Sequence, residues 1–420
     1  MVFNNKVSNL NAYSVSIFTK LSIVLIGFLI TVIQARYLGS EIKGQVAYIF
    51  NVASPISILM GFGIHQAYPY YRKKDCDVLP VFMMVALAIY FLYSLMCFPF
   101  FFLTRLSKNS VIFILIPIMV YCRIISYISM VENPNKKNLI ELLINFVELG
   151  FVTILFCFFT PSFYMGVSIL LLKDLLMAFI YTYHLRNKIS KIEFSTLFGW
   201  IRRLIRFGFL PMLALLMTTL NYRLDIIMLG GRVSDASIGV YSIGVMFAER
   251  LWMIPDAMKE VMVSKLAKGK DIDEVCLVMR ICNTVCLLVI VIMIIFGKPF
   301  IYIAFGNEYR GSYNIALVLL LGIVPMVYYK LIASYYITIR KQRLNFIFLS
   351  ISVITNIIAN LFLIPALGIL GAAVATVLSY GICSLLFVQS FHLLEKIEYK
   401  KMFLISQSDI SLIIHKGSKQ

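Results

Sequence analysis

Long apolar runs, broken by short polar segments, follow one another along almost the whole chain. A bilayer core about 30 Å thick requires about 20 apolar residues per helix, and the chain supplies such runs repeatedly. The runs lack the apolar and polar alternation that marks the strands of membrane barrels. The pattern predicts about twelve membrane-spanning helices. Their expected ranges are 13–35, 45–64, 79–103, 110–131, 138–160, 163–184, 205–229, 238–262, 276–297, 312–338, 344–364 and 369–393.

The two halves of the chain carry a similar segment at the same joint. ARYLGSEIKGQVAY (35–48) places Leu38-Gly39 between the first two expected spans. IMLGGRVSDASIGVYS (227–242) places Leu229-Gly230 between spans seven and eight. With six spans in each half, this duplication predicts two six-helix lobes related by an axis along the membrane normal.

The longest break between apolar runs, 186–203, separates the two halves. Its basic residues alternate with large apolar ones such as Phe194, Phe198 and Trp200, a composition typical of a helix that lies on a membrane surface. The expected organisation is an N-terminal six-helix lobe at 1–190, a cytoplasmic amphipathic linker at 191–203, a C-terminal six-helix lobe at 204–395 and a cytoplasmic tail at 396–420.

The breaks on one side of the predicted membrane carry many more Lys and Arg residues than those on the other. Arg72, Lys73 and Lys74 lie in one such break, and 340–343 is another. Since cytoplasmic loops are enriched in these residues, both termini are expected in the cytoplasm. The first apolar run is too long for a signal peptide and should remain as a span.

Composition narrows the class of protein further. The chain is 61% hydrophobic and only 14% charged, which excludes an ordinary soluble domain. The net charge of +18 is spread over the breaks, so it indicates membrane topology rather than a nucleic-acid partner. Most of the eight cysteines lie in apolar runs without a CxxC motif, so we expect packing residues and no disulfide framework.

Several charged residues interrupt the apolar runs themselves. Each costs about 2.5–3.5 kcal/mol at the centre of a bilayer, so such side chains usually face a protein interior or a wet cavity. Cations are in excess, which suits an anionic cargo such as a phosphate. The expected cargo-binding cations are Lys20, Arg123, Lys173, Arg223, Arg250 and Lys330. The expected proton or sodium sites are Glu148, Asp174, Asp225 and Glu249.

An alternative role for these residues is mutual neutralisation. Asp225 could pair with Arg223, and Glu249 could reach a cation on another helix. Lys173 and Asp174 are adjacent and point in different directions, so each requires a partner elsewhere. Both roles stay open at the level of sequence.

Signatures of catalysis are absent from the sequence. It has no P-loop, no HExxH and no G-x-S-x-G, and the breaks between spans are short. We therefore expect no enzyme activity, no cofactor and no metal site. A membrane-bound polysaccharide polymerase would require a large outer loop, and none is visible.

Three segments resemble one family of bacterial transporters. They are ARYLGSEIKGQVAYIFNVASPISILMGFGIHQA (35–67), LDIIMLGGRVSDASIGVYSIGVMFAERLWMIPDAMKEVMVSKLA (224–267) and TNIIANLFLIPALGILGAAVATVLSYG (355–381). These resemble the Wzx-type polysaccharide flippases of the multidrug/oligosaccharidyl-lipid/polysaccharide exporter superfamily. The resemblance rests on glycines and helix joints and covers nearly the whole chain. It implies a fold like that of MATE transporters, with six plus six helices around a cationic cavity.

The resemblance also implies a function. Such proteins move undecaprenyl-diphosphate-linked repeat units of O-antigen (the lipopolysaccharide glycan) or capsule across the bacterial cytoplasmic (inner) membrane by alternating access. Ion coupling, as in an antiporter, is expected. The expected partners are this lipid-linked glycan, membrane lipids and other polysaccharide assembly proteins. The alternatives are a drug or small-molecule exporter of the same fold, whose usual cargo is cationic, and a lipid II flippase, which generally carries two additional helices.

Overall fold

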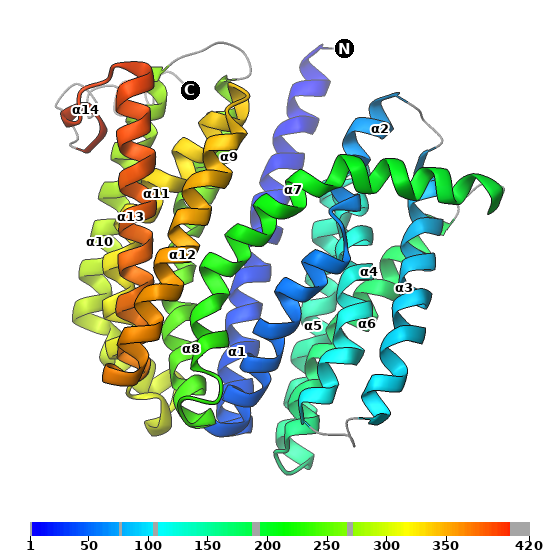
Figure 1. Cartoon of the computed structure of the whole chain (residues 1–420), viewed down its shortest axis with the longest axis horizontal. Helices are drawn as coiled ribbons and strands as arrows, with labels where there is room; N and C mark the ends of the chain where they lie inside the picture. Colours follow the sequence, from blue (N-terminus) through cyan, green and yellow to red (C-terminus); the bar gives the residue numbers. More distant parts are fainter. Residues whose placement is uncertain (1, 75–77, 104–107, 187–193, 267–271, 404–420) are drawn as a thin grey trace. The chain divides into compact units, whose positions relative to one another are not determined.

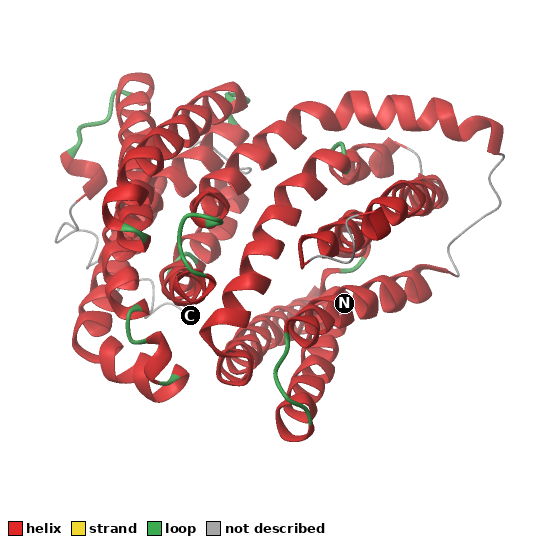
Figure 2. Cartoon of the chain, turned by 60° about the horizontal axis from the view of Figure 1, so that its bottom comes forward, coloured by secondary structure: helices red, strands yellow, loops and turns green. Residues whose placement is uncertain are grey.

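The computed structural model of the chain describes residues 2–74, 78–103, 108–186, 194–266 and 272–403. Within these ranges the chain is almost entirely helical, and no strand occurs (Figure 2). The expectation of an all-α polytopic membrane protein is confirmed.

The helices follow one another with short connections, as labelled in Figure 1. They are α1 Val2–Met60, η1 Ile64–Ala67, α2 Tyr68–Lys74, α3 Val78–Leu103, η2 Lys108–Ser110, α4 Val111–Glu132, α5 Pro134–Phe158, α6 Phe163–Leu185, α7 Phe194–Leu229, α8 Asp235–Arg250, α9 Met253–Leu266, α10 Ile272–Phe305, η4 Asn307–Tyr309, α11 Ser312–Thr338, α12 Gln342–Leu367, α13 Ile369–Glu395 and α14 Lys400–Phe403.

The described helices account for about twelve membrane crossings. Ten of them are long and apolar enough to cross a membrane. One of these, α1, has 59 residues and contains the first two expected spans. The pair α8 and α9 together covers the expected eighth span, although each helix alone is short.

Glycine makes the joint between the first two spans in each half of the chain. Gly39 interrupts α1 with φ 69° and ψ 174°. Gly231, with φ 73°, lies in the turn between α7 and α8. A side chain is strongly disfavoured at positive φ, so both joints require glycine. With Leu38 aligned to Leu229, Gly39 corresponds to Gly230, so the positive-φ glycine of the second half lies one residue further along.

The chain divides into two compact units, which we call unit 1 (residues 1–219) and unit 2 (residues 220–420). In unit 1, α1 packs against α5, and α4 packs against α3 and α6. In unit 2, α13 packs against α11 and α12, and α11 also packs against α8. Helix α7 contributes to both units because the boundary falls inside it.

The predicted lobe boundaries remain predictions. Of the expected linker, 194–203 forms the first turns of α7, and 191–193 lies outside the described residues. Of the expected tail, the described part includes the short helix α14, whose Met402 is buried and which packs against α10. The rest of the tail, 404–420, lies outside the described residues.

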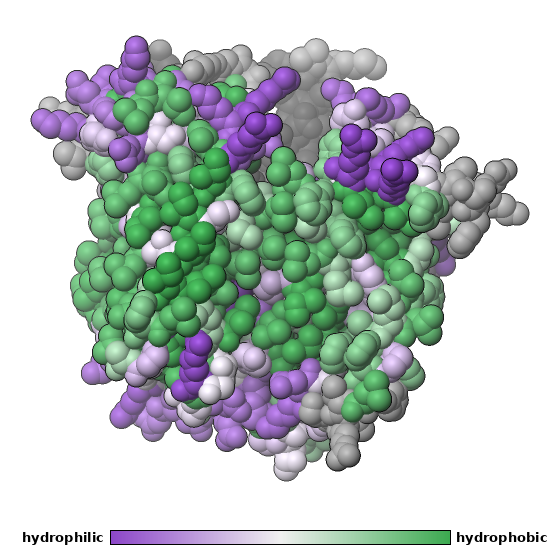
Figure 3. Space-filling view, viewed as in Figure 1, coloured by the Kyte–Doolittle hydropathy of each residue, from purple (hydrophilic) through white to green (hydrophobic). Residues whose placement is uncertain are grey.

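Apolar side chains cover the outward faces of the long helices. Leu95 of α3 is 75% exposed and Phe362 of α12 is 73% exposed. On the face drawn in Figure 3, hydrophobic side chains cover the middle of the helices, and hydrophilic ones gather towards their ends. This is the distribution that a lipid-facing surface requires.

The first half of α7 packs on the end of unit 1 (Figure 1). The ring of Trp200 lies 5.5 Å from that of Tyr71, and the ring of Phe207 stacks on Tyr70 at 4.9 Å. Next to these rings, Gly208 lies directly against the backbone of Gly63. The amphipathic sequence before span seven thus covers the α2 region of unit 1 with its aromatic side.

Candidate functional site

A break between α8 and α9 positions the candidate site. The N–H of Leu251 donates to Ala248 O at 3.2 Å, and that of Trp252 donates to Glu249 O at 3.0 Å, a tighter spacing than in an α-helix. Pro255 lacks an N–H, and its ring disfavours an α-helical turn before it. The eighth expected span is therefore two helices rather than one.

A cavity of about 480 Å³ opens in unit 2 at this break. Helices α7, α8, α9 and α11 supply its walls. The lining residues are Tyr222, Arg223, Met246, Glu249, Arg250, Trp252, Met253, Asp256 and Lys330. Three predicted cations and one predicted carboxylate thus share one cavity, together with residues that the sequence did not single out.

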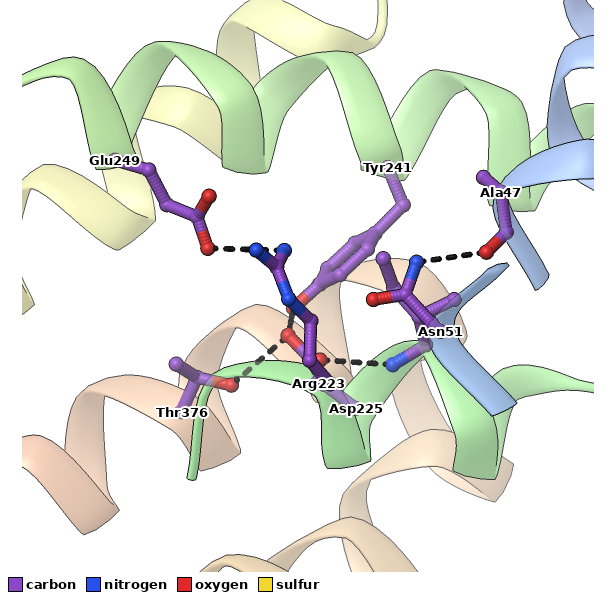
Figure 4. Close-up of polar contacts among 8 residues, drawn as sticks. Ala47, Asn51, Arg223, Asp225, Tyr241, Glu249 and Thr376 are labelled. Carbon is purple, nitrogen blue, oxygen red and sulfur yellow. Dashed lines mark hydrogen bonds and ion pairs between the residues drawn. The ribbon is translucent and has the colours of Figure 1, made fainter. Parts of the chain in front are cut away.

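Ion pairs connect most of the charges in this cavity. Nη1 of Arg223 lies 3.2 Å from Oε1 of Glu249 (Figure 4). Nζ of Lys330 lies 2.8 Å from Oδ2 of Asp256. None of the ion pairs within the described ranges includes Arg250, so this guanidinium gives the cavity its excess of positive charge.

The pairing corrects one alternative and confirms another. Among the described residues, the ion pair of Arg223 is with Glu249 and not with Asp225, which lies two residues further along α7. Glu249 does reach a cation on another helix, because Arg223 belongs to α7 and Glu249 to α8.

Aromatic rings form one wall of the cavity. The Tyr222 and Trp252 rings lie 4.4 Å apart, and the buried ring of Tyr380, which does not line the cavity, lies 6.0 Å from that of Trp252. The Lys330 ammonium sits over the Trp252 ring at 4.9 Å, within the range of a cation–π contact. Aromatic and cationic groups together can contact both a sugar ring and a phosphate.

Behind the cavity, Asp225 lies in a buried polar cluster (Figure 4). The Tyr241 hydroxyl donates to its Oδ2, and the Ile226 N–H donates to Oδ1 at 2.8 Å. The Thr376 hydroxyl lies 3.4 Å from Oδ2. Hydroxyl and amide donors thus satisfy this carboxylate, and no salt bridge of Asp225 occurs among the described residues.

Buried amides and hydroxyls extend the cluster between α7, α12 and α13. The Ser352 hydroxyl donates to Asn221 Oδ1 at 3.0 Å, and Asn356 Nδ2 lies 3.3 Å from Ser379 Oγ. Asn360 is fully buried and donates to Asn356 Oδ1 at 2.9 Å. Neutral polar residues of this kind carry no sequence signal beyond the spacing of four between Asn356 and Asn360.

No group of three or more His, Cys, Asp or Glu side chains that could hold a metal occurs in the described part of the chain.

Unit 1 holds a separate chain of polar contacts around Glu148, which is 5% exposed. Its Oε2 lies 3.0 Å from Nζ of Lys173, and its Oε1 accepts from Gln34 at 3.4 Å. Lys43 donates to Gln34 Oε1 at 3.0 Å. Lys173 therefore finds its partner on another helix, as its position beside Asp174 required.

The other predicted site residues of unit 1 are more dispersed. Arg123 is partly buried and donates to Ser57 Oγ at 3.1 Å. Asp174 is partly buried on α6, and Lys20 is exposed on α1. All of these belong to unit 1, whereas Arg223, Arg250 and Lys330 belong to unit 2.

Solved structures with the same architecture are transporters. One described as the lipid II flippase MurJ in an inward closed conformation matches with a TM-score of 0.74 at 15% identity, covering 97% of this chain and 93% of that chain. An inward-facing multidrug resistance MATE family transporter of the MOP superfamily matches with a TM-score of 0.65 at 14% identity, covering 90% and 96%. A MOP superfamily transporter from Pyrococcus furiosus, described as having a binding pocket of reverse polarity, matches with a TM-score of 0.61 at 13% identity, covering 91% and 95%. At these identities the matches define the fold.

The sequence itself matches a family model. The model described as "Polysaccharide biosynthesis protein" matches residues 11–255, more than half of the chain. The chain therefore belongs to the polysaccharide biosynthesis protein family and has the fold of the MOP exporter superfamily. No curated protein matches it in sequence.

Proposed function

We propose that this protein moves an undecaprenyl-diphosphate-linked oligosaccharide, the repeat unit of an O-antigen or a capsule, from the inner to the outer leaflet of the bacterial cytoplasmic membrane. The observation that carries the proposal is the cavity in unit 2, where Arg223, Arg250 and Lys330 line one space between membrane helices. Family membership supports a role in polysaccharide assembly. No bond is made or broken in this step, so no enzyme activity is required.

The diphosphate would contact the cations of the cavity, with Arg250 as its first partner because its guanidinium is in none of the ion pairs there. The aromatic wall around Trp252 would contact the sugars, and the polyprenyl tail would stay in lipid. Alternating access would then expose the site to each side in turn. Lys20, Arg123 and Lys173, which belong to unit 1, are the other candidate cargo-binding cations.

Coupling to protons or sodium is part of this proposal. An inside-negative potential favours export of a dianion by roughly 2.3 kcal/mol per charge per 100 mV, so ions would serve mainly to reset the carrier. Asp225 is the principal candidate because its buried carboxylate is held by hydroxyl and amide donors. Glu148, Asp174 and Glu249 are the other candidates.

The test is complementation of cells that lack this chain. We expect deletion to trap lipid-linked repeat units in the inner leaflet, Arg250→Ala to restore little export and Arg250→Lys to restore part of it. Arg232→Ala is the matched control, because Arg232 is an exposed arginine in the turn after α7 and is not among the cavity residues. Normal surface polysaccharide in the deletion strain, or full rescue by Arg250→Ala, would overturn the proposal.

One observation favours a second candidate function. Glu249 and Asp256 also line the cavity, and carboxylates suit the cationic cargo of a drug exporter. Under that alternative, Glu249→Gln would abolish efflux of a cationic dye while surface polysaccharide stayed normal.

A further inference from the structure

Asp256 lies between two lysines at the edge of the cavity. Its Oδ2 lies 2.8 Å from Nζ of Lys330, and its Oδ1 lies 3.0 Å from Nζ of Lys259. Lys330 comes from α11 and lines the cavity, whereas Lys259 follows Asp256 by three residues on α9. One carboxylate thus neutralises a cation that faces the cavity and a second cation on its own helix.

We propose that Asp256 is an exchangeable counter-ion: it holds Lys330 while the cavity is empty and releases this lysine to the diphosphate of the cargo, keeping Lys259 as its own partner. The proposal rests on the function proposed above. Asp256 is a positioning residue in this scheme, because it acts on the cargo through Lys330.

Burial explains why Lys330 requires a counter-ion. Its side chain is only 10% exposed, and an ammonium group removed from water is costly unless it is paired. The Trp252 ring at 4.9 Å supplies part of the compensation through its π face. A diphosphate could replace Asp256 as the anionic partner without leaving Lys330 unpaired.

The environment of Asp256 explains why it can release this lysine. The Asp256 side chain is 41% exposed, and Lys259, itself 35% exposed, lies 3.0 Å from its Oδ1 and would remain as a partner once Lys330 moved. Glu249 differs, since its side chain is 23% exposed and its ion pair is with Arg223 alone within the described ranges. Removal of Arg223 would leave a more buried carboxylate without its ion-pair partner. Of the two paired cations in the cavity, Lys330 is therefore the one that transfers to a ligand more readily.

The exchange has a consequence for transport. A carrier must release its cargo, and a site with three unpaired cations would hold a diphosphate tightly. With Asp256 present, binding replaces one ion pair by another, so only the difference in interaction strength contributes to affinity. On release the carboxylate regains Lys330, which offsets the loss of the phosphate contact.

Tryptophan fluorescence can follow this exchange directly. The chain contains two tryptophans: Trp252 in the cavity wall, and Trp200, which packs on Tyr71 in unit 1. In full-length protein with Trp200→Phe, placed in nanodiscs, all tryptophan emission comes from Trp252 beside Lys330. Farnesyl diphosphate is the probe, and farnesol is the uncharged control.

The expected Kd values separate the two partners of Asp256. Asp256→Asn should lower the Kd for farnesyl diphosphate about threefold to tenfold, because one partly exposed ion pair no longer competes for Lys330. Lys259→Met should raise the Kd by a similar factor, since Asp256 then holds Lys330 alone. In the Asp256→Asn background, Lys259→Met should change the Kd by less than about twofold.

Transport gives a readout that structural damage would not reproduce. Asp256→Asn should bind more tightly yet turn over more slowly in the complementation assay, and Asp256→Glu should restore both values. Damage to the fold would instead weaken binding and transport together. An unchanged or higher Kd in well-expressed Asp256→Asn, or an equal effect of Lys259→Met in both backgrounds, would refute the counter-ion role alone.

Failure of the proposed function has a different signature. If the parent binds farnesyl diphosphate no better than farnesol, no anion competes for Lys330, and both proposals are overturned. If the parent binds farnesyl diphosphate more tightly than farnesol, and Arg250→Ala abolishes this difference, the diphosphate-binding site is supported. The Asp256 variants then decide the counter-ion role by itself.

Discussion

The contact between Gly208 of α7 and Gly63 before η1 allows a sharp test of how α7 is fixed to unit 1. Gly63 has φ 64°, and a Cβ at Gly208 would lie 2.6 Å from three backbone atoms of Phe62 and Gly63. Backbone cannot rotate away as a flexible side chain does, so the two segments must separate. We predict that Gly208→Ala destabilises the protein.

The magnitude follows from the geometry and from an internal reference. Ordinary contact begins at 3.4 Å, so the segments must move apart by about 0.8 Å, and overpacking of this kind typically costs about 1–3 kcal/mol. Alanine also gains up to about 1 kcal/mol over glycine from helix propensity. Gly199 lies on the same helix, and an added Cβ there would meet nothing within 4 Å. Gly199→Ala therefore gains the helix-propensity contribution without any steric overlap. The difference between the two variants therefore isolates the backbone contact.

The assay is thermal unfolding of the purified full-length protein, followed by the fraction that remains monodisperse after heating. Gly208→Ala should fall below the parent, and Gly199→Ala should equal or exceed it. Equal midpoints for the two alanine variants would refute the close packing of α7 on unit 1. A midpoint of Gly208→Ala above that of the parent would do the same.

Three further predictions concern the buried charges. Lys173→Met should lower the free energy of unfolding by about 1–3 kcal/mol. This loss is smaller than for a fully buried ion pair because the Lys173 side chain is 39% exposed. In a double-mutant cycle, Glu148→Gln should restore part of the loss. Tyr241→Phe should lower the free energy of unfolding by about 1–3 kcal/mol, because a buried oxygen of Asp225 loses a hydrogen-bond donor. Thermal unfolding measures this loss, and an unchanged midpoint would argue against the hydrogen bond. Asp225→Asn should abolish any dependence of export on pH or sodium while leaving the protein folded. Export by this variant that still follows the parent's pH and sodium profiles would remove Asp225 from coupling.

Much of the fold could be predicted because apolar runs of fixed length have few alternatives in a bilayer. The joint at Gly39 was evident from its repeat near Gly230, and the structure adds that Gly39 and Gly231 have positive φ. The division of the eighth span was not predicted. Pro255 gave a local signal, but proline inside membrane helices is common, and the residues that bond across the break, Leu251 and Trp252, are ordinary apolar ones.

The candidate site was predictable only in part, because sequence shows which charges are embedded but not which of them meet. Arg223, Arg250 and Lys330 line one cavity although they come from three different helices. Asp256 escaped notice because it follows Pro255 near the end of its span and resembles an interfacial residue. The pairing of Arg223 with Glu249 rather than with Asp225 depends on side-chain direction, which spacing along one helix does not determine.

The two halves of the chain repeat the same helix joint, but the polar side chains near the joint differ. When Leu38 is aligned with Leu229, Gln34 of unit 1 takes the position of Asp225 in unit 2. Gln34 bridges Lys43 and Glu148, so the carboxylate of unit 1 comes from α5 and is paired with a lysine. Asp225 instead accepts from a hydroxyl and a backbone amide. The negative charge of Glu148 is balanced by a lysine, whereas neutral donors leave the negative charge of Asp225 unbalanced, so a bound cation would compensate more charge at Asp225. If ions drive this carrier, the asymmetry therefore predicts that they bind in unit 2. Gln34→Glu would place its carboxylate beside Lys43 and should leave the pH profile of export unchanged, so a second step in that profile would refute this reasoning.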